Sequence, residues 1–148
     1  MNTPDTTPTA GGPGATVLCV EDEPLSMALV GATLRAYPRI RLLEAVNGRD
    51  GVRLAQAHRP GLMLLDMQLP DIDGLEVVRS LSELIAERAI HVVLLTGEPF
   101  SIEVVKAMSL GAHEYWPKPL SQDRLASVLQ RVFGNPHDPR PVSGARPL

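Results

Sequence analysis

The sequence is poor in cysteine and in long apolar runs, a composition that does not suit a secreted or membrane-embedded protein. Cys19 is the one cysteine among 148 residues, so no intrachain disulfide can form and a reducing compartment suits the chain. No Lys or Arg precedes Arg35, and the N-terminus lacks an apolar segment, which argues against a secretory signal. No apolar stretch approaches the roughly 20 residues that span a bilayer. We therefore expect a cytoplasmic protein with no membrane partner.

The sequence also lacks a surplus of basic residues. Its 14 Lys and Arg against 17 Asp and Glu give a net charge of -3, without the basic footprint of a nucleic-acid-binding protein. The length suits one ordinary globular domain rather than two. We expect one functional site and no nucleic-acid partner.

Proline and small polar residues concentrate at both ends. Residues 1–15 are mostly Thr, Pro and Gly, and residues 134–148 include Pro136, Pro139, Pro141 and Pro147. Such segments have little apolar surface to bury. The sequence therefore predicts disordered tails at 1–15 and 134–148 around a domain at 16–133.

Between these ends, short apolar runs alternate with segments of helical spacing. The runs predict five strands, at Val17–Val20, Ile40–Glu44, Leu62–Leu65, Ile90–Leu95 and His113–Trp116. The intervening segments predict five amphipathic helices, the third of which extends from Leu75 to Ile85. Nearly continuous apolar strands that alternate with helices indicate a parallel sheet covered on both faces. We expect a doubly wound α/β fold with strand order 2-1-3-4-5.

Single residues support these helix positions. Asn47, Asp73 and Ser121 are suited to the N-cap position, where a side-chain oxygen accepts a backbone N–H. Pro24 suits the first turn of a helix, because the N–H that proline lacks would be unpaired there anyway.

Polar residues follow the carboxyl ends of four predicted strands. Glu21 and Asp22 follow the first strand, Asp66 the third, Thr96 the fourth and Lys118 the fifth. Ligands of doubly wound sheets bind outside these ends, so we expect the five side chains to meet in one crevice. Three close carboxylates repel one another and require a cation. Mg²⁺, which prefers oxygen ligands, is the natural candidate, and Mn²⁺ is an alternative.

This set of groups favours phosphoryl transfer. An aspartate carboxylate can form an acyl phosphate, which makes Asp66 the nucleophile. Glu21 and Asp22 would hold the metal, while the Thr96 hydroxyl and the Lys118 ammonium would bind phosphoryl oxygens.

Four segments at these positions resemble the receiver domains of response regulators. They are V-L-C-V-E-D-E at 17–23, L-M-L-L-D-M-Q-L-P-D-I-D-G at 62–74, V-L-L-T-G at 93–97 and Y-W-P-K-P-L at 115–120. The resemblance covers residues 15–133 and implies the flavodoxin-like receiver fold. It also implies a single-domain response regulator of a bacterial-type two-component phosphorelay, phosphorylated on Asp66. Such a protein is no enzyme toward other substrates and catalyses only its own phosphorylation and dephosphorylation.

The resemblance implies roles for further residues. The backbone carbonyl of Met67 would bind the metal together with Asp66, and Tyr115 would act with Thr96 as a rotameric switch. Taken alone, Tyr115 would rather be a core or interface residue. The Lys118–Pro119 bond is expected to be cis. Gln68 and Glu98 stand where the family tunes phosphoryl lifetime, and Gly97 is small enough to leave the phosphoryl group open to water.

The resemblance also implies partners. The phosphodonor would be a histidine kinase or a histidine phosphotransfer protein. No output module is expected after Phe133, so the signal would leave by binding of an unidentified output protein to the face of the fourth helix, fifth strand and fifth helix. A phosphorylation-dependent homodimer is also compatible with the family.

Three rival interpretations are weaker. Asp71-Ile72-Asp73-Gly74 matches the D-x-D-G pattern of haloacid-dehalogenase-type phosphatases and calcium loops, but no apolar strand ends at Asp71 and Leu69 stands where a calcium loop needs Asp. We expect a turn into the third helix there. A phosphatase for external substrates would need a substrate pocket or a cap insertion, and neither is evident. A phosphorylation-independent interaction scaffold would not need the complete acidic, hydroxyl and lysine set.

The four histidines have no evident partner in the sequence. We expect them at the ends of helices and strands or in a tail, and none of them as phosphodonor. They are His58, His91, His113 and His137.

Overall fold

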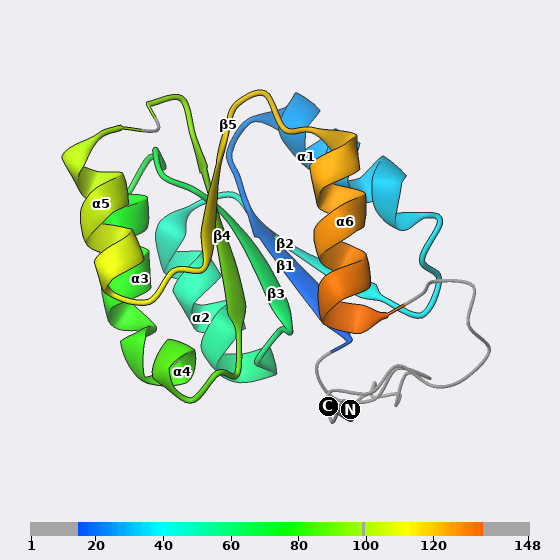
Figure 1. The fold of residues 1–148 in the computed structure, drawn as a ribbon, viewed down its shortest axis with the longest axis horizontal. Coiled ribbons are helices and arrows are strands. Elements are labelled where there is room, and N and C mark those ends of the chain that lie inside the picture. The colour runs from blue at the N-terminus through cyan, green and yellow to red at the C-terminus, as the bar shows by residue number, and fades with distance from the viewer. Residues whose placement is uncertain (1–14, 99, 135–148) are drawn as a thin grey trace.

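The computed structural model describes residues 15–98 and 100–134, which form a five-stranded parallel sheet with helices on both faces (Figure 1). The strands are β1 (Thr16–Val20), β2 (Arg41–Ala45), β3 (Leu62–Asp66), β4 (His91–Thr96) and β5 (Glu114–Pro117). Their order, β2-β1-β3-β4-β5, confirms the predicted order. The segments predicted as tails lie outside the described residues, except for Ala15 and Gly134.

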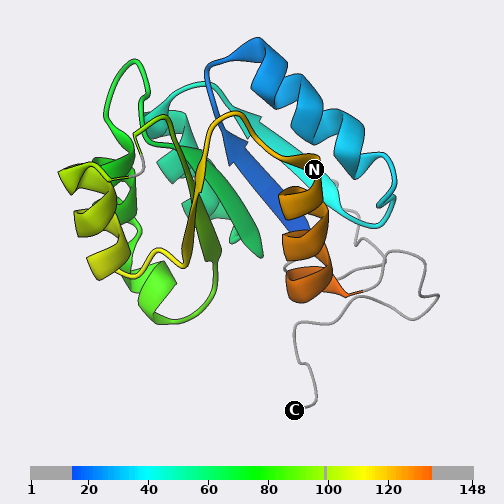
Figure 2. The same ribbon diagram turned by 45° about the horizontal axis from the view of Figure 1, so that its top comes forward.

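Two groups of helices cover the sheet. The helices are α1 (Pro24–Leu34), α2 (Gly48–His58), α3 (Gly74–Ser80), α4 (Ser82–Ala86), α5 (Ile102–Ser109) and α6 (Gln122–Phe133). Helices α1 and α6 lie on one face, and α2 to α5 lie on the other (Figures 1 and 2).

The prediction of five helices was wrong, because the predicted third helix is divided into α3 and α4. The division falls at Leu81, whose φ of -107° and ψ of 14° are not helical. Ser80 and Ser82 flank it, and serine is a weak helix former because its hydroxyl competes for backbone hydrogen bonds. The Leu81 side chain is buried in the core, so packing holds the chain at this bend.

The strands are apolar because each of their two faces meets a separate core. Leu18 and Val20 of β1 join the cluster beneath α2 to α5, whereas Val17 and Cys19 join the cluster beneath α1 and α6. This division follows from the alternation of side chains along a strand. Burial raises the pKa of the Cys19 thiol far above its usual value, and the nearby Glu21 acts in the same direction.

The predicted helix starts are confirmed. The Asn47 side chain accepts the Asp50 N–H at 2.8 Å, and Asp73 accepts the Glu76 N–H at 2.9 Å. Ser121 caps α6, and Pro24 is the first residue of α1.

A glycine sets the distance between α2 and β1. A Cβ atom on Gly51 would lie 2.8 Å from Cγ2 of Val20, which is too close for a real contact. Glycine therefore lets the helix pack directly on the strand.

Candidate functional site

Acidic residues from β1 and β3 meet a lysine at the carboxyl edge of the sheet. Glu21, Asp22 and Asp66 each offer a carboxylate oxygen, and these three oxygens lie within 4.8 Å of one another. Lys118 Nζ lies 3.1 Å from Asp66 Oδ2 and 3.6 Å from Glu21 Oε2. The fold thus brings together four of the residues selected from the sequence, although almost a hundred positions separate the first from the last.

Glu21 is an unusual carboxylate because its side chain is completely buried. Its Oε2 atom accepts the Glu23 N–H at 3.1 Å, while its Oε1 atom has no hydrogen-bond partner within the described part of the chain. Burial raises the pKa of Glu21 to about 7, and the neighbouring Asp66 acts in the same direction. A buried polar atom without a partner is costly, so this oxygen calls for a proton or a cation.

The donor set fits a divalent cation. Glu21 supplies the unpaired buried oxygen, Asp66 lies beside it and Asp22 is exposed at the entrance. Mg²⁺ takes one or two protein carboxylates and completes its shell with water and phosphate oxygens, and Mn²⁺ shares its preference for oxygen. A bound cation would also relieve the repulsion among the three carboxylates.

Asp66 and Lys118 hold each other in place. Asp66 Oδ1 accepts the Gln68 N–H at 3.0 Å, and Oδ2 contacts the lysine. Burial alone would lower the pKa of Lys118, but Asp66 and Glu21 raise it above its usual value. The lysine therefore remains a cation beside the Asp66 carboxylate.

Thr96 lies next to Lys118 at the end of β4. Its backbone carbonyl accepts the Lys118 N–H at 2.8 Å, and its hydroxyl oxygen accepts the Glu98 N–H at 2.9 Å. The Thr96 hydroxyl group can therefore still donate a hydrogen bond to another acceptor. A Cβ atom on Gly97 would meet no heavy atom within 4 Å. The access of water to a phosphoryl group beside Gly97 stays a prediction.

Tyr115 lies outside the carboxylate cluster. The residue is 39% exposed and lines a hollow of about 510 Å³ together with Phe100, Val104, Val105, Met108 and Ser109. The site and this hollow are linked through β5, since Lys118 follows the strand that carries Tyr115. The Lys118–Pro119 bond is cis, as expected.

The Met67 carbonyl has a different partner from the expected metal. It accepts the Gly74 N–H at 3.0 Å in the loop between β3 and α3. One of its lone pairs is therefore used within the loop, and its role as a metal ligand stays a prediction.

Asp71 makes a structural contact that could not be predicted from the sequence. Its two carboxylate oxygens accept the N–H groups of Gly48 at 2.7 Å and Arg49 at 2.9 Å. Although desolvation acts to raise it, the pKa of Asp71 is lowered to about 2, chiefly by these two N–H groups. Asp71 thus fastens the loop that follows Asp66 to the start of α2. The predicted turn is confirmed, and Asp71 serves this structural contact.

The histidines lie at the ends of elements, as expected, but they do have partners. His58 ends α2 and contacts Arg41, with 3.2 Å between Nδ1 and Nη2. His91 begins β4 and lies 2.9 Å from Glu114, and the His113 ring is stacked on the His91 ring. These partners were not evident in the sequence because they are distant along the chain. His137 lies outside the described residues.

No helix in the two described ranges combines the length and apolarity needed to cross a membrane.

Sequence comparison connects this site to a known family. The family model of the response regulator receiver domain matches residues 17–130. The chain is 30% identical over 119 residues to the protein PilH of Pseudomonas aeruginosa, an alignment that covers 80% of this chain and 98% of PilH. It is 33% identical over 121 residues to the polar-differentiation response regulator DivK of Brucella anthropi, covering 80% of this chain and 96% of DivK.

Solved structures agree with the sequence comparison. One is the receiver domain of a sensor histidine kinase from Pseudomonas aeruginosa with a magnesium ion coordinated in its active site cleft. The two chains are 28% identical with a TM-score of 0.69, and the match covers 80% of this chain and 97% of that one. Another is a chain in the co-crystal structure of the Saccharomyces cerevisiae histidine phosphotransfer protein Ypd1 with the receiver domain of Ssk1. The two chains are 25% identical with a TM-score of 0.71, and the match covers 81% of this chain and 89% of that one. The chain belongs to the family of response regulator receiver domains.

Proposed function

We propose that this chain is a response regulator that accepts a phosphoryl group on Asp66 in a Mg²⁺-dependent reaction and signals by phosphorylation-dependent protein binding. The observation that carries the proposal is the contact of Lys118 with Asp66 beside a buried, unpaired oxygen of Glu21. A nucleophile, a fixed cation and a carboxylate set suited to a divalent ion are the groups that phosphoryl transfer requires.

The residues have distinct roles in the proposed reaction. An Asp66 carboxylate oxygen forms an O–P bond while the N–P bond of a donor phosphohistidine breaks, and the electron pair of that bond returns to the donor imidazole. Lys118 and the Thr96 hydroxyl bind phosphoryl oxygens, and Glu21, Asp22 and Asp66 would hold Mg²⁺, which supplies positive charge for the same oxygens. Hydrolysis reverses the modification when water attacks phosphorus and the Asp66 carboxylate leaves.

The proposed phosphodonor is a histidine kinase or a histidine phosphotransfer protein. A hollow of about 520 Å³ extends from Glu21 and Asp22 along α1 past Met27 and Gly31, and it offers a donor a surface that leads to the site. The similarity to a receiver domain crystallised with the phosphotransfer protein Ypd1 supports a donor of this class. We place the protein in the cytoplasm, where such donors present their phosphohistidine.

The proposed output passes through Tyr115. Phosphorylation would draw Thr96 toward the phosphoryl oxygens and change the position of the Tyr115 ring, which would alter the surface for an output protein or a second copy of the chain. In the structural numbering, the face predicted from the sequence consists of α5, β5 and α6.

Incubation with acetyl phosphate and Mg²⁺, followed by intact-mass measurement, tests the proposal. We expect an adduct of one phosphoryl group on the wild type, no adduct on Asp66→Asn and no adduct when EDTA replaces Mg²⁺. Asp123→Asn is the matched control, since Asp123 is exposed on α6, and it should be modified like the wild type. An unmodified wild type would favour the phosphorylation-independent scaffold, and a modified Asp66→Asn variant would assign the acceptor elsewhere.

A further inference from the structure

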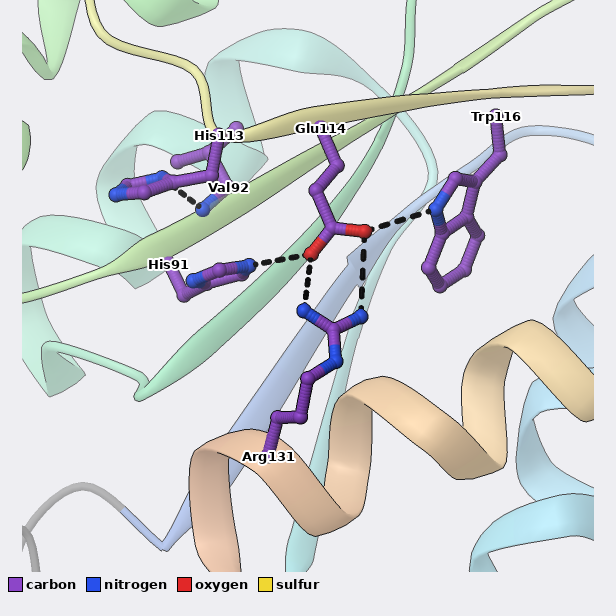
Figure 3. A network of polar contacts seen from close by, with 6 residues as sticks. All are labelled: His91, Val92, His113, Glu114, Trp116 and Arg131. Atoms are coloured by element: carbon purple, nitrogen blue, oxygen red, sulfur yellow. Dashed lines mark hydrogen bonds and ion pairs between the residues drawn. The ribbon is translucent and has the colours of Figure 1, made fainter.

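Four contacts converge on the Glu114 carboxylate at the start of β5 (Figure 3). Arg131 of α6 donates through Nη1 to Oε2 at 2.9 Å and through Nη2 to Oε1 at 3.3 Å. His91 Nε2 of β4 lies 2.9 Å from Oε2, and Trp116 Nε1 donates to Oε1 at 3.2 Å. Together these contacts connect β4, β5 and α6.

The carboxylate stays charged at any ordinary pH. Burial acts to raise its pKa, but the hydrogen bonds from Arg131, His91 and Trp116 lower the pKa of Glu114 to about 2. A two-pronged contact between guanidinium and carboxylate also fixes the orientation of both groups. The Glu114 side chain is 23% exposed and the Arg131 side chain is 52% exposed, so solvent partly screens this contact.

The segment before β5 is attached to β4 as well. The His113 ring stacks on the His91 ring with centroids 4.4 Å apart, and its Nδ1 atom accepts the Val92 N–H at 3.0 Å. The His113 backbone N–H donates to the Val92 carbonyl at 2.9 Å. These contacts attach the start of β5, an edge strand of only four residues, to β4.

On the opposite face of β5, which carries Tyr115, the described residues form no comparable network of polar side-chain contacts. Side chains alternate along a strand, so Tyr115 points away from Glu114 and Trp116, toward the hollow beside α5. No hydrogen bond involves the Tyr115 hydroxyl in the described ranges. Helix α5 buries two residues, Val104 and Ala107, whereas α6 buries four, which are Leu125, Val128, Leu129 and Phe133.

We infer that the Glu114 carboxylate is a lock that fixes β5 to β4 and α6, so that the response to phosphorylation is confined to Tyr115 and α5 while α6 stays in place. Glu114 and Arg131 are then positioning residues, and the output surface is narrower than the face of α5, β5 and α6. The inference rests on the proposed function, because it concerns how a change at Asp66 leaves the site.

Hydrogen exchange read by mass spectrometry, with Mg²⁺ and with or without beryllofluoride as the phosphoryl mimic, tests the lock. In the wild type, peptides from the loop after Asp66 should become protected, and peptides covering Tyr115 and α5 should change. Peptides covering α6 (Gln122–Phe133) should exchange at the same rate in both states.

Breaking the lock should extend the response to α6. In Arg131→Met, which keeps an apolar side chain of similar length, we expect α6 to exchange about two- to fivefold faster, as for the loss of a solvent-exposed ion pair. Its exchange should also become sensitive to beryllofluoride. Arg131→Lys restores the charge without the planar fork and should give intermediate rates. Arg124→Met is the matched control on the same helix, because among the described residues Arg124 forms no hydrogen bond or ion pair with Glu114, and it should behave like the wild type.

The outcomes separate the lock from the proposed function. If the loop after Asp66 does not respond to beryllofluoride, the proposed function fails and the lock fails with it. If that loop responds but α6 of the wild type changes as much as α5, the lock is overturned and the proposed function stands. An Arg131→Met variant that behaves like the wild type also overturns the lock. Should Arg131→Met not fold, the wild-type comparison and Arg131→Lys give the answer.

Discussion

Replacing Glu21 by Gln should stabilise the metal-free protein at alkaline pH. The pKa of this buried carboxyl rises from 4.5 to about 7 on folding, so the folded state binds more protons than the unfolded chain in this interval and loses stability as pH increases through it. At about 1.4 kcal/mol for each pH unit, an ionised Glu21 costs on the order of 3 kcal/mol. Glutamine removes this cost, keeps one oxygen that can accept the Glu23 N–H and loses the charged contact with Lys118 at 3.6 Å. We therefore expect a gain of about 2 kcal/mol.

Urea unfolding at about pH 9, with EDTA or with Mg²⁺, measures this effect. The wild type should gain about 2.7 kcal/mol when free Mg²⁺ is about 100 times its dissociation constant, and Glu21→Gln should gain less. Asp22→Asn is the control, because Asp22 is exposed: it should weaken the magnesium response with little change in metal-free stability. A Glu21→Gln variant that is less stable than the wild type without metal would contradict a destabilising buried charge at Glu21, and an undiminished response to magnesium would contradict its role as a metal ligand.

Three other substitutions test the packing and the lock by urea unfolding. Gly51→Ala should destabilise the protein by about 1 to 3 kcal/mol, because its methyl group would lie 2.8 Å from Val20, and a neutral effect would contradict the close packing of α2. Gly31→Ala in α1 meets no atom within 4 Å and should instead stabilise by about 0.5 to 1 kcal/mol. Glu114 has its pKa lowered from 4.5 to about 2, so its contacts stabilise the fold above pH 4.5 and are lost as pH falls through this interval. Glu114→Gln should cost about 0.5 to 1 kcal/mol at neutral pH, because its partner Arg131 is 52% exposed. The variant should also lose less stability at acid pH than the wild type, and an unchanged loss at acid pH would contradict the role assigned to Glu114.

The sheet could be predicted from the sequence because its signals are local. The apolar runs fall within a residue or two of the observed strands, and Asn47, Asp73 and Ser121 cap helices as expected. The convergence of Asp66 and Lys118 followed from the strand order, since parallel strands in that order end at one edge.

Features that depend on side-chain direction could not be predicted in this way. The sequence presents Glu21 and Asp22 as an equivalent pair, yet one is buried and the other exposed. The bend at Leu81 interrupts an apolar spacing that is compatible with one helix. His91, Glu114 and Arg131 each look like ordinary surface residues, and their contact requires the exact placement of α6 against the edge of the sheet.

A crystal structure with Mg²⁺ and beryllofluoride would test the proposal that Asp66 is the phosphoryl acceptor beside a bound metal. We expect beryllium bonded to an Asp66 carboxylate oxygen, Mg²⁺ bound among Glu21, Asp22 and Asp66, and the fluorines in contact with Lys118 and the Thr96 hydroxyl. Crystals grown under these conditions with Asp66 unmodified, or with the metal bound away from the three carboxylates, would contradict it.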